Sequence, residues 1–166
     1  NPINKNILMD DYNYKLDNYL FPIIKEINNP IILELGVQSG TSTKKFLDIC
    51  NKNNGKLFSV DIDDCSKVSD NKNWNFFHSR DDNFEFIKSK IPHKIDVLFI
   101  DTLHEAEHVK KLIYGYYPLL KKNGYLFIDD VSHLPYLKNM PRNNFYCEIN
   151  NKETFDLLLA IYSENY

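Results

Sequence analysis

The apolar positions of the chain fall into short runs that are separated by segments with the three- and four-residue spacing of amphipathic helices. The runs predict five β-strands, over residues 30–37, 56–62, 74–79, 95–101 and 124–131. The first, fourth and fifth are apolar through their centres, which is typical of parallel strands covered on both faces. The helical segments predict helices over 12–27, 41–53, 82–90, 105–120 and 152–166.

Strands and helices in alternation predict an α/β fold: a doubly wound, Rossmann-like parallel sheet with right-handed crossovers and helices on both faces. At 166 residues the chain has room for a single domain, residues 1–166. Within it, 1–29 forms a covering helix interrupted by Pro22, and 30–131 forms the alternating core. Residues 132–166 hold a long irregular excursion (132–151) and the last helix. Loops of that length often line a site.

Composition and charge argue against several classes of partner. The net charge is -3, and only two of the 20 basic residues are arginines, so nucleic acid is not expected as a partner. No apolar run approaches the ~20 residues of a membrane span, so no membrane partner is expected either. The three cysteines are widely spaced and form no CxxC pair, which is typical of a reducing compartment and predicts a cytoplasmic protein.

The turn after the first strand, Glu34-Leu-Gly-Val-Gln-Ser-Gly40, is the most informative stretch. Two glycines let the backbone approach a ligand closely, and the helix that follows presents free N–H groups. Gln38 breaks the G-x-G-x-x-G dinucleotide pattern, and Thr41 stands where a phosphate-binding P-loop has lysine. An acid just before the first glycine suits a ligand that carries positive charge. The alternative is a tight turn in another α/β fold.

This turn resembles the first motif of the class I S-adenosylmethionine-dependent methyltransferases. The resemblance continues through SVDID (59–63), HSRDDNF (78–84) and the block from DVLFID to IDDV (96–131), which is similar to the catechol- and sugar-type small-molecule O-methyltransferases. It implies that S-adenosylmethionine is the cofactor and that its binding residues are Glu34, Gly36, Gly40, Thr41, Asp61, Asp81 and Asp82. In that family the acid after the second strand holds the ribose, and acids after the third meet the adenine. Alternatively, Asp61 caps a helix and the Asp81–Asp82 pair stabilises a helix N-terminus.

Acids also follow the fourth and fifth strands: Asp101, Asp129 and Asp130. Adjacent parallel strands lie ~4.8 Å apart, so these carboxylates converge and repel unless protonated, paired with cations or bound to a metal. Oxygen ligands suit Mg²⁺, and the resemblance implies metal ligands at these three positions, although catechol-type enzymes carry Asn at the last. The alternative is solvated strand-end charge. Asp101 and His104 are the candidate catalytic residues, His104 as general base or substrate anchor, or else a plain helix-start residue; His108 is expected on the helix surface.

These observations predict S-adenosylmethionine-dependent methyl transfer, assisted by a divalent metal, to a hydroxyl of a small-molecule acceptor such as a sugar or phenol. The alternative is a cofactor-binding or assembly module without turnover; a reductase is disfavoured because the third glycine is absent. In the methyltransferases that the chain resembles, two further strands usually lie beside the fifth. Here the open edge implies a homodimer, a truncated chain, or a makeshift strand from NFYCEI (144–149).

Overall fold

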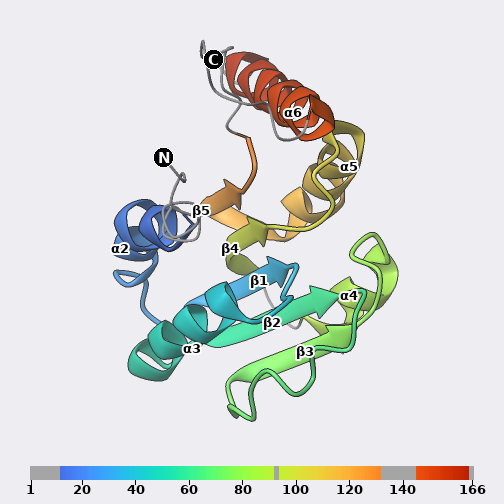
Figure 1. Cartoon of the computed structure of the whole chain (residues 1–166). Helices are drawn as coiled ribbons and strands as arrows, with labels where there is room; N and C mark the ends of the chain where they lie inside the picture. The colour runs from blue at the N-terminus through green and yellow to red at the C-terminus, as the bar shows by residue number, and fades with distance from the viewer. Residues whose placement is uncertain (1–11, 92–93, 132–144, 165–166) are drawn as a thin grey trace, which may run out of the picture.

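The computed structural model describes residues 12–91, 94–131 and 145–164, and its centre is one parallel sheet. The strands lie in the order β3-β2-β1-β4-β5 (Figure 1). Their bounds are β1 (Ile31–Leu35), β2 (Lys56–Asp61), β3 (Trp74–His78), β4 (Ile95–Ile100) and β5 (Leu120–Ile128). All four neighbouring pairs are parallel. The strand order reverses at β1, which is where ligands bind in open α/β sheets.

Helices cover both faces of the sheet, as the alternating pattern predicts. One face carries η1 (Leu16–Leu20), α2 (Phe21–Ile24) and α3 (Thr41–Asn53), and Ile32 of β1 points into that core. The other face carries α4 (Phe84–Lys90) and α5 (Ala106–Tyr116), with Leu33 and Leu35 pointing into their core. α6 (Phe145–Glu164) lies beside α5 (Figure 1). The doubly wound α/β prediction is therefore confirmed.

The covering helix at the N-terminus is present, but its interruption precedes Pro22. Residues 12–15 are α-helical and η1 is a π-helical turn, after which Pro22 sits in the first turn of α2. Proline is tolerated in a first turn because its missing N–H has no intrahelical partner there. Leu16, Leu20 and Ile24 anchor the segment in the core beside α3.

Several predicted boundaries were wrong, for local reasons. The helix predicted to Leu120 ends at Tyr116, because η2 (Tyr117–Leu119) turns around Pro118 and β5 begins directly after it. The helix predicted from Asp82 begins at Phe84, because the Asp82 carboxylate bonds basic side chains instead. The strands end before the acids that follow β4 and β5, so those carboxylates stand on loops at the sheet edge.

The suggestion that NFYCEI (144–149) forms a makeshift strand is wrong, because residues 145–149 belong to α6. Asn150 and Thr154 are buried, Thr154 Oγ1 donates to the Asn150 carbonyl, and Leu158 packs against the core of α5, so tertiary packing selects the helix. Of the excursion predicted over 132–151, residues 145–151 belong to α6, so the last helix begins at Phe145 and not at Lys152, and 132–144 lie outside the described part of the chain. In the part that is described, no strand pairs with the outer edge of β5, and no helix is both long and apolar enough to cross a membrane.

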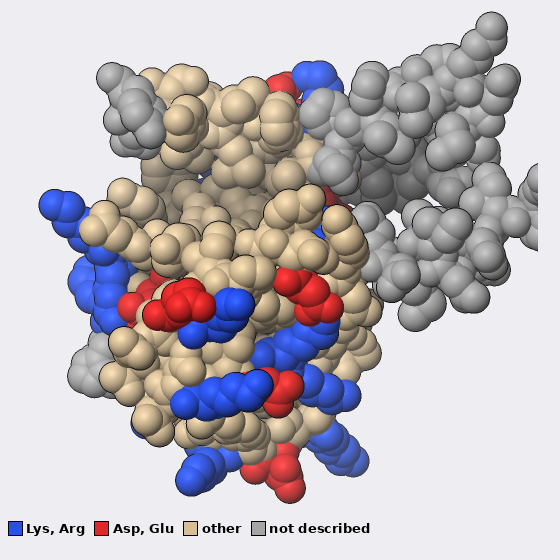
Figure 2. All heavy atoms as spheres, turned by 90° about the vertical axis from the view of Figure 1, so that its left-hand side faces the viewer, with Lys and Arg blue, Asp and Glu red and all other residues tan. Residues whose placement is uncertain are grey.

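The face drawn in Figure 2 mixes acidic and basic side chains. Such pairs join separate elements; for example, Lys45 Nζ of α3 lies 2.5 Å from Asp17 Oδ1 of η1. Exposed pairs of this kind contribute about 0–1 kcal/mol each, so they orient the covering helix without deciding the fold.

Candidate active site

A cavity of about 950 Å³ opens at the carboxyl ends of the strands. Its walls come from the N-terminal helix, the turn after β1, the ends of β2 and β3, and the segments after β4 and β5. Of the residues predicted for the site, the cavity is lined by Gly36, Thr41, Asp61, Asp81, Asp101, His104, Asp129 and Asp130. Glu34, Gly40 and Asp82 do not line it. The fold thus brings most of the predicted set to one place, at the point where the strand order reverses.

The glycine turn is shaped by close backbone packing. Gly36 has φ +98°, and a Cβ there would lie 1.7 Å from the main-chain oxygen of Asp101. Gly40 has φ +79° and precedes α3, where a Cβ would lie 2.2 Å from Val68 Cγ1. Only glycine fits both conformation and space at these two positions. The turn can therefore lie against the end of β4 and expose its own backbone to the cavity.

Glu34 lies behind this turn and is fully buried. Its carboxylate accepts hydrogen bonds from Ser42 Oγ at 2.6 Å, Thr43 Oγ1 at 2.9 Å and Ser59 Oγ at 2.7 Å. Burial raises the pKa of Glu34 to about 7, against the effect of the hydroxyl donors. The predicted direct contact with a cofactor does not agree with this placement, because side-chain hydroxyls already occupy the buried carboxylate. Glu34 instead ties β1 to α3 and β2.

Asp61, the last residue of β2, holds the same turn from the cavity side. Its Oδ2 accepts from the N–H of Val37 at 2.7 Å and of Gln38 at 3.0 Å, and its Oδ1 accepts from Asp63 N–H at 2.9 Å. Burial acts to raise the pKa of Asp61, but these N–H donors outweigh it and hold the pKa below its usual value. No helix begins here, so the helix-cap alternative is wrong.

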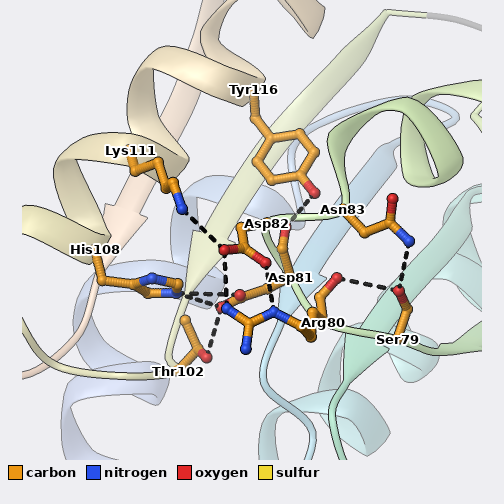
Figure 3. A network of polar contacts seen from close by, with 9 residues as sticks. All are labelled: Ser79, Arg80, Asp81, Asp82, Asn83, Thr102, His108, Lys111 and Tyr116. Carbon is orange, nitrogen blue, oxygen red and sulfur yellow. Dashed lines mark hydrogen bonds and ion pairs between the residues drawn. The ribbon is translucent and has the colours of Figure 1, made fainter.

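Asp81 is the centre of a polar network at the β3–α4 corner (Figure 3). Its Oδ2 accepts from Thr102 Oγ1 at 2.8 Å and lies 2.9 Å from His108 Nε2, and its carbonyl accepts from Tyr116 OH. The His108 side chain is only 11% exposed, so the expected surface position is wrong. This network connects the cavity wall to α5, and Thr102 and His108 themselves line the cavity.

Asp82 does not line the cavity, and its carboxylate contacts basic side chains (Figure 3). Arg80 Nε donates to Asp82 Oδ1 at 2.9 Å, and Lys111 Nζ donates to Asp82 Oδ2 at 3.0 Å. These bonds hold the pKa of Asp82 well below its usual range. The helix-start explanation is not supported for either acid, because α4 begins only at Phe84 and Asn83 is its N-cap residue. Asp82 acts in the structure as a partner of α5.

The acids after β4 and β5 meet at the other end of the cavity, where each has a donor or cation. Tyr12 OH donates to Asp101 Oδ2 at 2.7 Å, and Lys15 Nζ lies 3.0 Å from Asp129 Oδ1. His104 Nε2 lies 3.2 Å from Asp130 Oδ2 and 3.6 Å from Asp101 Oδ1. Burial, opposed by the bond from Tyr12, raises the pKa of Asp101 above its ordinary value. Burial and Asp101 raise the pKa of Tyr12 and keep its hydroxyl protonated.

The predicted metal site does not fit this arrangement. Carboxylate oxygens suit Mg²⁺ by type, but Mg²⁺ needs several of them around one point at about 2.0–2.1 Å. Here Tyr12 and Lys15 occupy one oxygen of Asp101 and one of Asp129. Among residues 12–91, 94–131 and 145–164, no group of three or more His, Cys, Asp or Glu side chains could hold a metal ion. We therefore assign no metal to Asp101, Asp129 and Asp130.

Among the lining residues that sequence reasoning missed, four have side chains that contact acids of the cavity: Tyr12, Lys15, Thr102 and His108. Tyr12 and Lys15 lie three positions apart on one helix and so share a face, which is a usable signal. The partners they reach are 89 and 114 residues away, and no local pattern encodes that pairing.

Comparisons with known proteins agree with this fold. A family model described as a methyltransferase domain matches residues 33–131. No curated protein sequence gives a significant match. A structure provisionally named a caffeoyl-CoA O-methyltransferase, from Staphylococcus aureus, is 18% identical with a TM-score of 0.65, over 89% of this chain and 73% of that chain.

The MycE methyltransferase of the mycinamycin biosynthetic pathway, solved with Mg, S-adenosylhomocysteine and mycinamycin VI, is also similar. It is 20% identical with a TM-score of 0.59, over 72% of this chain and 33% of that chain. The chain thus spans about a third of the length of MycE, and at this identity the likeness concerns the fold. The chain belongs to the methyltransferase-domain family, and its fold is that of the class I S-adenosylmethionine-dependent methyltransferases.

Proposed function

We propose that the protein transfers a methyl group from S-adenosylmethionine to a hydroxyl of a small molecule, such as a sugar or phenol. The observation that carries the proposal is the single cavity at the point where the strand order reverses, with the glycine turn and Asp61 at one end and His104 at the other. Such a cavity can hold a cofactor and an acceptor side by side. The family match to a methyltransferase domain supports the same activity.

The end of the cavity near β1 and β2 suits the cofactor. The exposed turn from Gly36 to Ser39 offers backbone close to a ligand, and Thr41 adds a hydroxyl. Asp61 can accept hydrogen bonds from two ribose hydroxyls, in exchange for or beside its bonds to the turn. Asp81, held by Thr102 and His108, lines the wall where a nucleobase would extend. Glu34 supports this end from behind through Ser42 and Thr43.

The other end suits an acceptor hydroxyl. When bound, S-adenosylmethionine supplies a methyl group on a positively charged sulfur. With that cofactor bound, His104 would take the hydroxyl proton at Nδ1, because its Nε2 faces the carboxylates of Asp130 and Asp101. Transfer of the methyl carbon from sulfur to the acceptor oxygen would leave S-adenosylhomocysteine and a methyl ether. Asp130, 3.2 Å from His104 Nε2, orients the imidazole. The rest of the catalysis is alignment of the acceptor oxygen with the methyl carbon.

The sequence also predicts assistance by a divalent metal and a homodimer. Mg is present in the MycE structure, but the donor set here does not fit the ion, so we route no step through a metal. A homodimer that covers the outer edge of β5 remains our proposal and is tested by sedimentation velocity.

The first experiment is calorimetric titration with S-adenosylhomocysteine. We expect micromolar binding by the wild type and at least about tenfold weaker binding by Asp61→Ala. Asp64→Ala is the matched control, because Asp64 makes the same bond to the N–H two residues on but lies outside the cavity lining. A folded wild type that binds no S-adenosylhomocysteine would contradict the proposal. Transfer of labelled methyl to catechol or a sugar then separates an enzyme from the alternative, a binding module without turnover.

A further inference from the structure

Two side chains of the N-terminal helix reach across the cavity to the strand ends. Tyr12 OH donates to Asp101 and Lys15 Nζ bonds Asp129, at 2.7 and 3.0 Å. Residues 12–15 precede the region matched by the family model, which begins at residue 33. The acidic end of the cavity is therefore completed by a segment outside the common core.

Lys15 is the cation that faces this end. Two lysine or arginine side chains line the cavity in the described part of the chain, Lys15 and Arg80, and Arg80 is engaged by Asp82 at the opposite end. Asp129 is only 17% exposed, so its bond to the ammonium is partly shielded from solvent. Such an ion pair is stronger than one on the open surface.

The position of Lys15 also conflicts with a divalent cation. A metal ion bound by Asp129 would stand a few ångströms from the ammonium, and two positive centres at that distance repel strongly in a poorly solvated site. An ammonium donates up to three hydrogen bonds. A carboxylate lone pair that accepts one of these bonds binds a metal ion less strongly than a free lone pair would. The occupied oxygens of Asp101 and Asp129 thus lie where a metal would need them free.

We propose that Lys15, together with Tyr12, takes the place of a divalent cation at this acidic cluster. On this proposal, which rests on the proposed function, Lys15 and Tyr12 are positioning residues that neutralise Asp129 and orient Asp101. They leave Asp130 and His104 to face the acceptor. The cluster takes up no divalent cation while Lys15 is in place, and loss of the ammonium opens it to one.

The test is titration with Mn²⁺ alone, followed by electron paramagnetic resonance of the free ion. We expect the wild type to leave Mn²⁺ free into the millimolar range and Lys15→Gln to bind it at least about tenfold more tightly. Lys15→Arg should behave as the wild type because it keeps the charge. Lys121→Gln is the matched control: Lys121 bonds Asp96 at 2.8 Å with similar exposures, 43% and 14%, but outside the cavity lining.

Two results would overturn the proposal. One is Mn²⁺ binding by the wild type as tight as by Lys15→Gln, and the other is no gain in Lys15→Gln when its thermal melt shows it folded. Adding Asp129→Asn to Lys15→Gln should remove the gained binding; if binding persists, the ion sits elsewhere and the proposal is wrong. S-adenosylhomocysteine calorimetry on the same samples reports the proposed function separately, since the Mn²⁺ titration needs no cofactor.

Discussion

The two ends of the cavity are built by different means. At the end near β1 and β2, main-chain N–H groups of Val37 and Gln38 meet a carboxylate 24 and 23 residues away. At the other end, side chains of the N-terminal helix meet carboxylates 89 and 114 residues away. A turn made of backbone keeps its shape when side chains change, whereas a cluster of side chains changes with each substitution. On the proposed function, we infer that the first end binds the cofactor and that the second end binds the acceptor.

The largest effect that we expect is on the backbone-built end. Gly36→Ala places a Cβ 1.7 Å from the main-chain oxygen of Asp101, at a φ of +98° that alanine rarely adopts. We expect a loss of at least about 3 kcal/mol in the free energy of unfolding, measured by urea denaturation. Gly124→Ala is the control, because its nearest contact is the movable Leu120 side chain at 2.9 Å and its φ is not positive. Equal losses in the two variants would refute the close packing of the turn on β4.

Glu34 makes the same end depend on pH. Its pKa is raised from 4.5 to about 7, so between these values the folded state holds a proton that the unfolded state has lost. The stability it contributes is full below pH 4.5 and is lost as pH rises through about 7, by roughly 3 kcal/mol. Asp61 and Asp82, whose pKa is lowered in the folded state, contribute stability that is lost as pH falls. Their effect on stability is thus opposite in direction to that of Glu34 and occurs at lower pH.

Urea denaturation of the wild type and Glu34→Gln from pH 4.5 to 7.5 isolates this contribution. We expect the stability of the wild type to fall relative to the variant as pH rises, because glutamine does not titrate. A constant difference across that range would mean that Glu34 is ionised throughout, and that Ser42, Thr43 and Ser59 outweigh its burial.

The smallest effect is expected at the end built from side chains. Tyr12→Phe removes one donor to Asp101, which should cost about 1–2 kcal/mol, seen as a lower melting temperature. Tyr14→Phe, on an exposed residue two positions on, should change the melting temperature very little. If the two variants have the same melting temperature, the bond from Tyr12 adds nothing to stability. The stability losses from substitutions at the two ends of the cavity would then differ by more than we expect.

The apolar pattern of the chain was enough to predict the sheet, the helices that cover it and the rim where the site lies. Apolar periodicity reports which face of an element is buried, and parallel strands carry the residues after them to one edge. Gly36 and Asp61 could therefore be placed at this edge from the strand pattern, while their assignment to a cofactor site came from the resemblance to the methyltransferases. Both glycines of the turn have a positive φ, a conformation that glycine adopts without strain.

Which side chains meet in the site depends on how distant elements pack together. Glu34 is enclosed by Ser42, Thr43 and Ser59 because α3 and β2 pack against that face of β1, so it supports the turn from behind. Lys15 reaches Asp129 because the first turn of the N-terminal helix lies beside the strand ends. Periodicity specifies faces but not the crossing of distant elements, and hydrogen bonds and ion pairs depend on ångström-scale placement. For that reason the acids were predicted from the sequence, while their partners, and with them the poor fit of these acids to a metal, came from the fold.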